Sequence, residues 1–373
     1  WQGALQGSVE FNWQVNQAPD LKLELITDNG AIGLSRDDDE PLTLPYHQLR
    51  LAANTEVDHQ IKFRFDMQAP NMGQGYIEAR IQPEDKPYTI NGAMLLEKVN
   101  LAILKPFLPA MRHLTGEMNL SGGLSGPITR PDFYGEFSLL EGEAAAKNTP
   151  INLTHTNINA SIRGKEASIT GQLNSGEGLA KLAGKIDWSG EEPSMKLKFD
   201  GEKLEFKQKP LFKAKISPDL DILVKPYYVD IKGKANVEDA ILRPQILSDK
   251  AIPLSADVQV IDLNAKDRLK IAKVMRQWDI NADIDLLLAD NVLFQGFGLN
   301  SKLTGNIRLQ EQKQRGMQAI GEITLDKEAK YEAYGQNLQI RRGGLLFAGS
   351  ITQPALDIEA IKEVDSKVVG ERV

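Results

Sequence analysis

Cysteine is absent from this 373-residue sequence, and aromatic residues make up only 6% of it. The absence of cysteine excludes a disulfide framework and a thiolate metal site. Long apolar runs are also missing. Stretches such as LAILKPFLPAM at 101–111 are interrupted by lysine and proline and fall short of the ~20 apolar residues that a membrane-spanning helix needs. The net charge of −7 argues against a nucleic-acid-binding protein, which usually carries a basic patch.

Recognisable catalytic and cofactor motifs are absent too. GLAKLAGKI at 178–186 resembles a phosphate-binding loop, but it has one residue too many between its glycines, and Ile186 stands where Ser or Thr would hold magnesium. No GxSxG nucleophile motif occurs. The histidines lie far apart and in no zinc-binding spacing: His47, His59, His113 and His155. We therefore expect a protein that is not an enzyme and that needs neither a cofactor nor a metal.

What the sequence does contain is alternation of apolar and polar residues in short runs, most legibly in residues 321–360. Period two is typical of strands with one apolar and one polar face. Dipeptides such as Asn29-Gly30 and Asn91-Gly92 favour tight turns between runs, so that adjacent strands pair antiparallel. The pattern predicts an all-β fold built as a mostly antiparallel meander. With so many strands, the sheet is expected to be elongated.

Two segments break this rhythm and predict short helices. In residues 98–114, Pro106 favours a helix start, and the apolar residues after it fall on one side: Phe107, Leu108, Met111 and Leu114. In residues 265–278, Ile271, Val274, Met275 and Trp278 have helical spacing and the remainder is basic. This second helix fits a cap over a sheet end or a contact with lipid headgroups. We expect three segments of one continuous groove, 1–97, 98–263 and 264–373, the last two opened by these helices.

The apolar face of such a sheet must be buried against something. Two apolar faces packed as a dry sandwich are the usual solution for an all-β chain. The uniform alternation and the scarcity of aromatic residues favour instead a U-shaped sheet whose concave apolar face stays open and binds a guest. The residues that we predict to line this groove are Ile61, Phe63, Phe65, Ile158, Ile162, Val258, Val260, Ile284, Leu286, Leu288, Ile323, Leu325, Leu338, Ile340, Leu345, Phe347, Leu356 and Ile358.

Residues 331–360, YEAYGQNLQIRRGGLLFAGSITQPALDIEA, resemble the C-terminal region of the TamB family, in which a YG-x-x-L-x-I strand precedes G-x-L-x-F-x-G and P-x-L-x-I-x-A strands. Residues 101–137 and 217–244 are also similar to this family. The resemblance covers most of the chain after residue 95, whereas residues 1–95 carry only generic alternation. It implies a β-taco, a U-shaped sheet with an apolar lumen, related to the AsmA-like and bridge-like lipid transfer proteins.

The resemblance also implies a location and partners. Members of the family are anchored in the inner membrane by an N-terminal helix, cross the periplasm and meet the outer-membrane barrel TamA through their C-terminal end. The present chain starts at Trp1 inside an alternating run and stops in VVGERV, so we expect a piece of a longer protein that lacks the anchor and part of that end. The family's roles are phospholipid transport to the outer membrane and assembly of outer-membrane proteins.

The alternating pattern and the family resemblance lead to three alternative hypotheses for the function. The first is a lipid conduit that shields phospholipid acyl chains in the groove and leaves headgroups at its open rim. The second is a chaperone-like scaffold for nascent outer-membrane β-barrels and autotransporters, which would bind by strand addition. The third, a solenoid enzyme or adhesin acting on polysaccharide, needs convergent carboxylates and an exposed aromatic platform, and the sequence offers neither.

Overall fold

The chain forms two compact units. Unit 1 comprises residues 1–147, 153–173 and 182–195, and unit 2 comprises residues 148–152, 174–181 and 196–373. The computed structural model describes residues 2–12, 20–34, 42–56, 58–70, 73–82, 88–108, 111–147, 150–208, 210–244, 279–313, 315–333 and 336–362.

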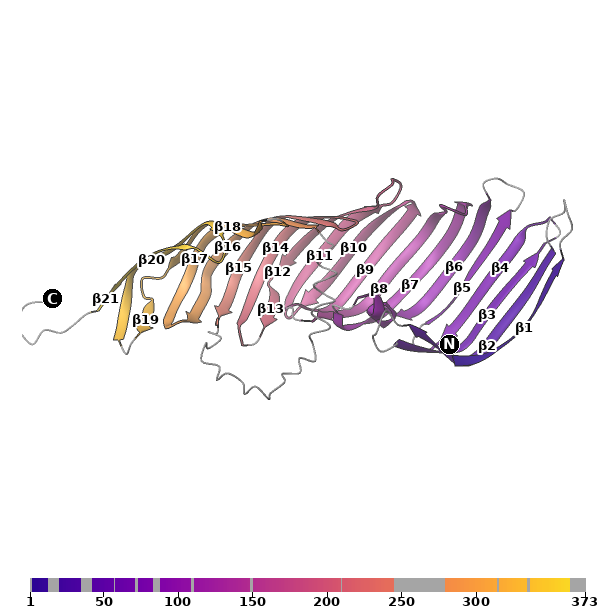
Figure 1. The fold of residues 1–373 in the computed structure, drawn as a ribbon, viewed down its shortest axis with the longest axis horizontal. Helices are drawn as coiled ribbons and strands as arrows, with labels where there is room; N and C mark the ends of the chain where they lie inside the picture. The colour runs from indigo at the N-terminus through magenta and orange to yellow at the C-terminus, as the bar shows by residue number, and fades with distance from the viewer. Residues whose placement is uncertain are drawn as a thin grey trace, which may run out of the picture. The chain divides into compact units, whose positions relative to one another are not determined.

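Unit 1 is an antiparallel meander (Figure 1). Each of its first strands is hydrogen-bonded to the next: β1 (Gln2–Asn12), β2 (Asp20–Leu34), β3 (Leu42–Thr55), β4 (Ile61–Ala69), β5 (Gly73–Gln82), β6 (Thr89–Asn100), β7 (Met111–Pro127) and β8 (Asp132–Ala146). They are followed by β9 (Asn152–Gly164) and β10 (Glu166–Ser175), which pair with each other. The next strands are β11 (Gly178–Asp187) and β12 (Ser194–Glu202), which contribute residues to both units, as do the ends of β9 and β10.

Unit 2 contains the remaining strands: β13 (Leu204–Gln208), β14 (Phe212–Lys225), β15 (Tyr228–Leu242), β16 (Asp279–Gly296), β17 (Leu299–Gln312), β18 (Gly316–Leu325), β19 (Lys330–Ala333), β20 (Gln336–Ser350) and β21 (Ala355–Ile361). Their pairings are antiparallel except that of β15 with β16, which is parallel. A parallel pair needs a long crossover, and the chain between these two strands is long enough to supply it. The predicted all-β, mostly antiparallel fold is confirmed in both units.

The described strands belong to one sheet. From β1 to β8 and from β13 to β21, substantial contacts between strands join only hydrogen-bonded neighbours. The described strands include no second sheet that could pack on the first as in a two-sheet sandwich. That the apolar face stays open for a guest remains a prediction.

Both dipeptides that we expected to form turns lie inside strands, so this prediction was wrong. Asn29 sits within β2 in a left-handed conformation, with φ of 51°, where the register with β1 shifts between the pairs Gln2–Ala31 and Ala4–Asp28. Gly92 lies in β6, where it pairs with Ala79. A Cβ atom added to Gly92 would lie 2.3 Å from the carbonyl oxygen of Glu78, so glycine serves close strand contact there.

The first predicted helix is also misplaced. The structure has a 3-10 helix, η1 (Leu101–Phe107), that ends where the predicted helix was to begin, while Met111 and Leu114 belong to β7. Pro106 has no backbone N–H and disfavours helical geometry at the residue before it, which argues against an α-helix across this point. The second predicted helix, residues 265–278, lies outside the described residues.

β-Bulges at one level of neighbouring strands bend the sheet. In unit 2 the register shifts between Lys215 and Ile216 of β14, between Val237 and Asp239 of β15, and across Leu288–Val292 of β16. These positions are aligned, because Ile216 pairs with Val237 and Val237 with Leu288. A bulge adds a residue to one strand and increases its local bend and twist. The extra residues lie on β15 and β16, so we expect the sheet to bend across these two adjacent strands.

No helix in the described ranges is both long enough and apolar enough to cross a membrane.

Candidate functional site

A line of directly paired residues crosses unit 2 from β16 to β21. Leu288 pairs with Gly305, which pairs with Ile323. Ile323 pairs in turn with Leu345, and Leu345 with Leu356. Directly paired residues project to the same face, as do alternate residues along each strand. The predicted residues of this region therefore share one face, which we call the apolar face of unit 2: Ile284, Leu286, Leu288, Ile323, Leu325, Leu338, Ile340, Leu345, Phe347, Leu356 and Ile358.

Unit 1 has a corresponding apolar face. Phe63 pairs with Ala53 on one side and Ala79 on the other, and Phe65 pairs with Leu51 and Ile77. Ile61 continues the same face toward Ile81 and Ile90. On β9, Ile158 and Ile162 alternate with exposed Asn159 and Arg163. Of the predicted lining residues, Val258 and Val260 lie outside the described residues. That any of these side chains touches a lipid stays a prediction.

Charge is almost excluded from both apolar faces. From β3 to β6, the positions in register with Phe63 and Phe65 carry no charged side chain. In unit 2, among the positions from β13 to β21 whose register is described, Glu311 is the only charged residue on this face. It lies near the end of β17, beside Ala282 and Met317. An ion that entered either face would lose hydration without a partner, whereas a hydrocarbon would not.

The apolar faces are partly buried even though no second layer covers them. In unit 2 the buried cluster consists of Ala214, Val237, Ala240, Val292, Leu303, Leu325, Ala329 and Ile340. In unit 1 it consists of Leu44, Tyr46, Leu49 and Ala69. The side chains of each cluster pack against one another, which leaves them little accessible surface.

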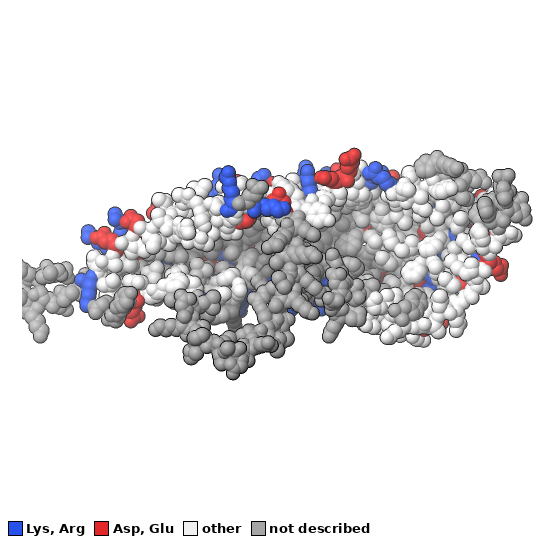
Figure 2. All heavy atoms as spheres, viewed as in Figure 1, with Lys and Arg blue, Asp and Glu red and all other residues white. Residues whose placement is uncertain are grey.

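Away from these clusters the apolar faces remain accessible. Ile284, Leu286 and Ile323 are half-buried, and Leu356 and Ile358 on β21 are 65% and 45% exposed. Figure 2 shows, on the side turned to the viewer, a surface dominated by uncharged residues, with most acidic and basic side chains gathered at its edges. The result is an apolar surface that is neither filled by its own side chains nor open to full hydration.

The opposite face carries the ion pairs. In unit 1 the Arg64 guanidinium donates to Asp66 and Glu78 at 2.8 and 2.9 Å and lies 4.6 Å from the centre of the Tyr76 ring. In unit 2 Arg308 donates two 2.6 Å hydrogen bonds to Asp283. The arginine bonds hold the pKa of the Glu78 and Asp283 carboxyls below its usual range. These pairs identify the hydrated face of each unit.

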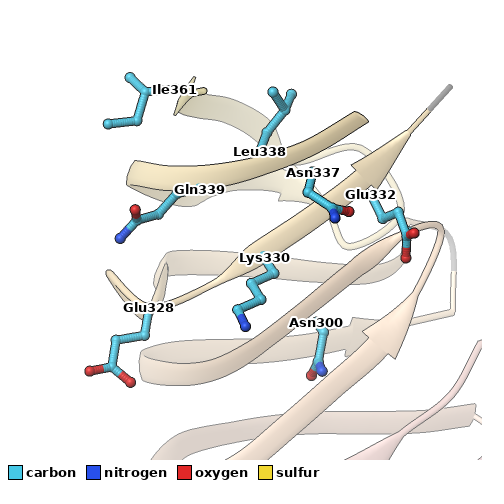
Figure 3. Close-up of a pocket in the computed structure, with 9 residues that line it drawn as sticks. Asn300, Glu328, Lys330, Glu332, Asn337, Leu338, Gln339 and Ile361 are labelled. Carbon is cyan, nitrogen blue, oxygen red and sulfur yellow. The ribbon is translucent and has the colours of Figure 1, made fainter. Parts of the chain in front are cut away.

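A cavity of about 770 Å³ on the hydrated side of unit 2 does not match the predicted groove. Its lining comes from β17, β19, β20 and nearby residues and is mainly polar: Gly298, Asn300, Glu328, Lys330, Glu332, Asn337, Leu338, Gln339 and Ile361. Figure 3 shows Leu338 projecting to the opposite side from Lys330 and Gln339, as alternation requires. Its polar side chains can bind water and polar groups, and of the predicted groove residues only Leu338 lines it. No cluster of metal-ligating side chains occurs in the described part of the chain.

Sequence analysis missed a set of residues that fix the bulges. Lys98, Glu141 and Lys203 have positive φ angles of 57°, 47° and 51°. Each donates its backbone N–H to a polar side chain of a neighbouring strand: Asn119 Oδ1 at 2.8 Å, Asn157 Oδ1 at 3.1 Å and Ser217 Oγ at 2.9 Å. Isolated polar residues on an alternating strand give no hint of this role. The role becomes visible only in the structure, where the same backbone-to-side-chain hydrogen bond recurs at three positions.

Comparison with known proteins gives consistent matches along the chain. The TamB C-terminal domain model matches residues 167–372, and the TamB N-terminal domain model matches residues 1–139. The second match extends into residues 1–95, where the sequence alone offered only generic alternation. The translocation and assembly module subunit TamB of Haemophilus influenzae is 24% identical over 337 residues. That alignment covers 87% of this chain and 26% of the relative, so the chain spans about a quarter of its length.

Proposed function

Because the chain belongs to the TamB family, we propose that it is a periplasmic segment of a non-enzymatic lipid conduit in a protein anchored in the inner membrane. Phospholipids would move along the two apolar faces toward the outer membrane, in support of outer-membrane assembly with the barrel protein TamA. The relative's printed name, translocation and assembly module subunit, supports the link to TamA. The observation that supports the proposal is the almost uncharged and partly exposed apolar face in each unit.

The chemistry of that face suits acyl chains. Burying hydrocarbon yields ~25 cal/mol per Å² of apolar area, so a chain of many methylenes is held without a specific polar contact. Successive residues along the face are similar, such as Leu286, Leu288 and Ile323, and neighbouring positions of a bound chain therefore differ little in free energy. Sliding along such a surface requires no catalytic residue. Headgroups would stay near the strand ends, where water and charged side chains are available.

The test uses two isoleucines of one strand. Ile323 lies on the apolar face of β18, whereas Ile320, three residues away, lies on the hydrated face and is 53% exposed. A photo-crosslinking amino acid placed at either position in the full-length protein in cells reports what touches each face. We expect phospholipid adducts from position 323 and few from position 320, as measured by mass spectrometry of the purified protein. The opposite ratio, or equal labelling, would contradict the proposal.

The edge strand β21 supports a second candidate function, a scaffold that binds nascent outer-membrane β-strands. Within the described residues β21 pairs only with β20, and its side chains are exposed along its whole length. An unpaired edge can receive another strand through main-chain hydrogen bonds. A photo-crosslinking amino acid at Ala355 or Glu359 would then capture outer-membrane proteins. Adducts with lipid alone at these positions would exclude the scaffold function for this edge.

A further inference from the structure

The 3-10 helix η1 lies across the apolar face of unit 1. It follows β6, yet it contacts β3, which is separated from β6 by β4 and β5. A 3-10 helix of 7 residues is about 14 Å long, which equals about three strand spacings. The helix is therefore long enough to reach from β6 back to β3 over the intervening strands.

Lys105 is the one charged residue of η1, and Ile103 and Leu104 are apolar residues that differ in their surroundings. Ile103 packs against the buried cluster of Leu44, Tyr46, Leu49 and Ala69, together with Phe65 and Met67. Leu104 and the following Leu108 point away from it and are 37% and 39% exposed. Connections between strands are normally polar because they face water. This connection instead presents hydrocarbon both to the apolar face and to the space above it.

The hydrogen bonds that hold η1 are local. Asn100 accepts a 2.8 Å bond from the N–H of Ala102 at the start of the helix. At its end the Leu108 N–H donates to the Lys105 carbonyl at 3.0 Å. Just beyond it, the N–H of Met111 at the start of β7 donates to the Leu108 carbonyl at 2.9 Å. The contact of the helix with β3 is made by side-chain packing, through Ile103.

We propose that η1 is a displaceable strap, which occupies the position of an acyl chain on the apolar face of unit 1 until a phospholipid takes its place. The inference rests on the lipid-conduit function proposed above. The side chain of Ile103 and an acyl chain are both saturated hydrocarbon, and they compete for the surface formed by Leu49, Phe65 and Met67. An acyl chain covers more of that surface than one isoleucine does. Because both ends of η1 stay tethered to β6 and β7, the strap returns once the lipid has passed.

The test exploits the absence of cysteine from these 373 residues, and any cysteine elsewhere in the full-length protein is replaced by serine. The double variant Ile103→Cys/Met67→Cys, made in the full-length protein, is closed with a short bifunctional thiol reagent and compared with the same protein left open. A photo-crosslinking amino acid at Phe65 reports lipid at the strap, and one at Ile323 reports lipid in unit 2. The closed and the open protein are each exposed to vesicles of phosphatidylethanolamine and phosphatidylglycerol. We expect closure to lower lipid capture at position 65 several-fold and to leave capture at position 323 unchanged.

If lipid capture at position 65 were the same in the closed and the open protein, the strap proposal would be wrong. Loss of capture at both positions, in the closed and the open protein, would instead refute the lipid-conduit function. A second pair of variants tests the strap without introduced cysteines. Ile103→Ala should raise capture at position 65, because the strap is held less firmly, whereas Leu104→Ala should not, because Leu104 faces away from the cluster. Equal capture in the two variants would also overturn the strap.

Discussion

The two units protect the same kind of apolar face in different ways. In unit 2 the buried cluster is made by small and branched side chains from adjacent strands, such as Ala240, Val292 and Leu303. In unit 1 the cluster is built around Tyr46 and is covered by a separate segment, η1. Protection in unit 2 is thus fixed by the backbone of the sheet, whereas in unit 1 part of it comes from a tethered element. An alternating sequence is compatible with both solutions.

The largest expected difference is between two isoleucines that occupy these clusters. Ile340 of unit 2 is 2% exposed, whereas Ile103 of η1 is only partly buried. Ile340→Ala should lower the free energy of unfolding by about 2 to 4 kcal/mol, because it leaves a cavity in the packed cluster. Ile103→Ala should cost about 1 kcal/mol, since less apolar area is lost. Chemical denaturation of the whole chain measures both.

Leu346→Ala is the matched control on the strand of Ile340, because Leu346 is 54% exposed on the other face and should change stability little. Equal losses for Ile340→Ala and Ile103→Ala would remove the distinction between the two clusters.

A smaller loss of stability is expected from a change at Tyr46, at the centre of the unit 1 cluster. The Tyr46 hydroxyl lies 2.8 Å from Thr27 Oγ1, and both residues are almost fully buried, at 2% and 3% exposure. Tyr46→Phe weakens the pairing of a buried hydroxyl and should cost about 1 to 2 kcal/mol. Hydrogen exchange should then accelerate in β2 and β3 and stay unchanged in unit 2. Tyr134→Phe, at a residue 53% exposed, serves as control, and a similar change there would rule out this explanation.

Loss of one of these hydrogen bonds should lower the free energy of unfolding by a similar amount in both units. The expected difference between the units is therefore confined to their buried clusters. Asn119→Ala removes the acceptor for the Lys98 N–H, and Ser217→Ala removes the acceptor for the Lys203 N–H. Each should cost about 0.5 to 1 kcal/mol, because water replaces part of the lost bond. Asn119→Asp keeps an acceptor oxygen and should restore the stability, as measured by thermal unfolding. A loss in Asn119→Asp as large as in Asn119→Ala would show that the hydrogen bond is not responsible.

The smallest effect concerns the ion pairs of the hydrated face. The folded-state pKa of the Glu78 and Asp283 carboxyls lies below the unfolded value because each accepts hydrogen bonds from an arginine. Their contribution is therefore fully present above the unfolded pKa and is lost as the pH falls through the folded pKa. Each pair is partly exposed, so solvent screening should keep its contribution to stability at neutral pH small.

In Asp283→Asn the acid-dependent loss of stability should be smaller than in the wild type. Denaturation at neutral pH and below pH ~4 tests this, and an unchanged pH dependence would mean that Asp283 is not involved.

Alternation was sufficient to predict the faces of the strands but not the positions of turns and bends. The predicted residues from Ile284 to Ile358 share a face because period two survives the pairing of each strand with its neighbour. Asn29-Gly30 and Asn91-Gly92 misled because glycine serves a bulge or a close strand contact as readily as a turn. η1 was misplaced because a 3-10 helix has no strong sequence period of its own. Its contact with β3 depends on the tertiary arrangement of four strands, which local pattern does not encode.

A sheet whose strands touch only their immediate neighbours has a consequence for how such proteins change in size. Stability in this arrangement is close to a sum of nearest-neighbour contributions, as in repeat proteins. Insertion or loss of one complete hairpin would leave the cross-section of every other hairpin as it was, and each remaining strand would keep its inward and outward residues. Chain length can therefore vary between relatives without a change in the faces of the remaining strands.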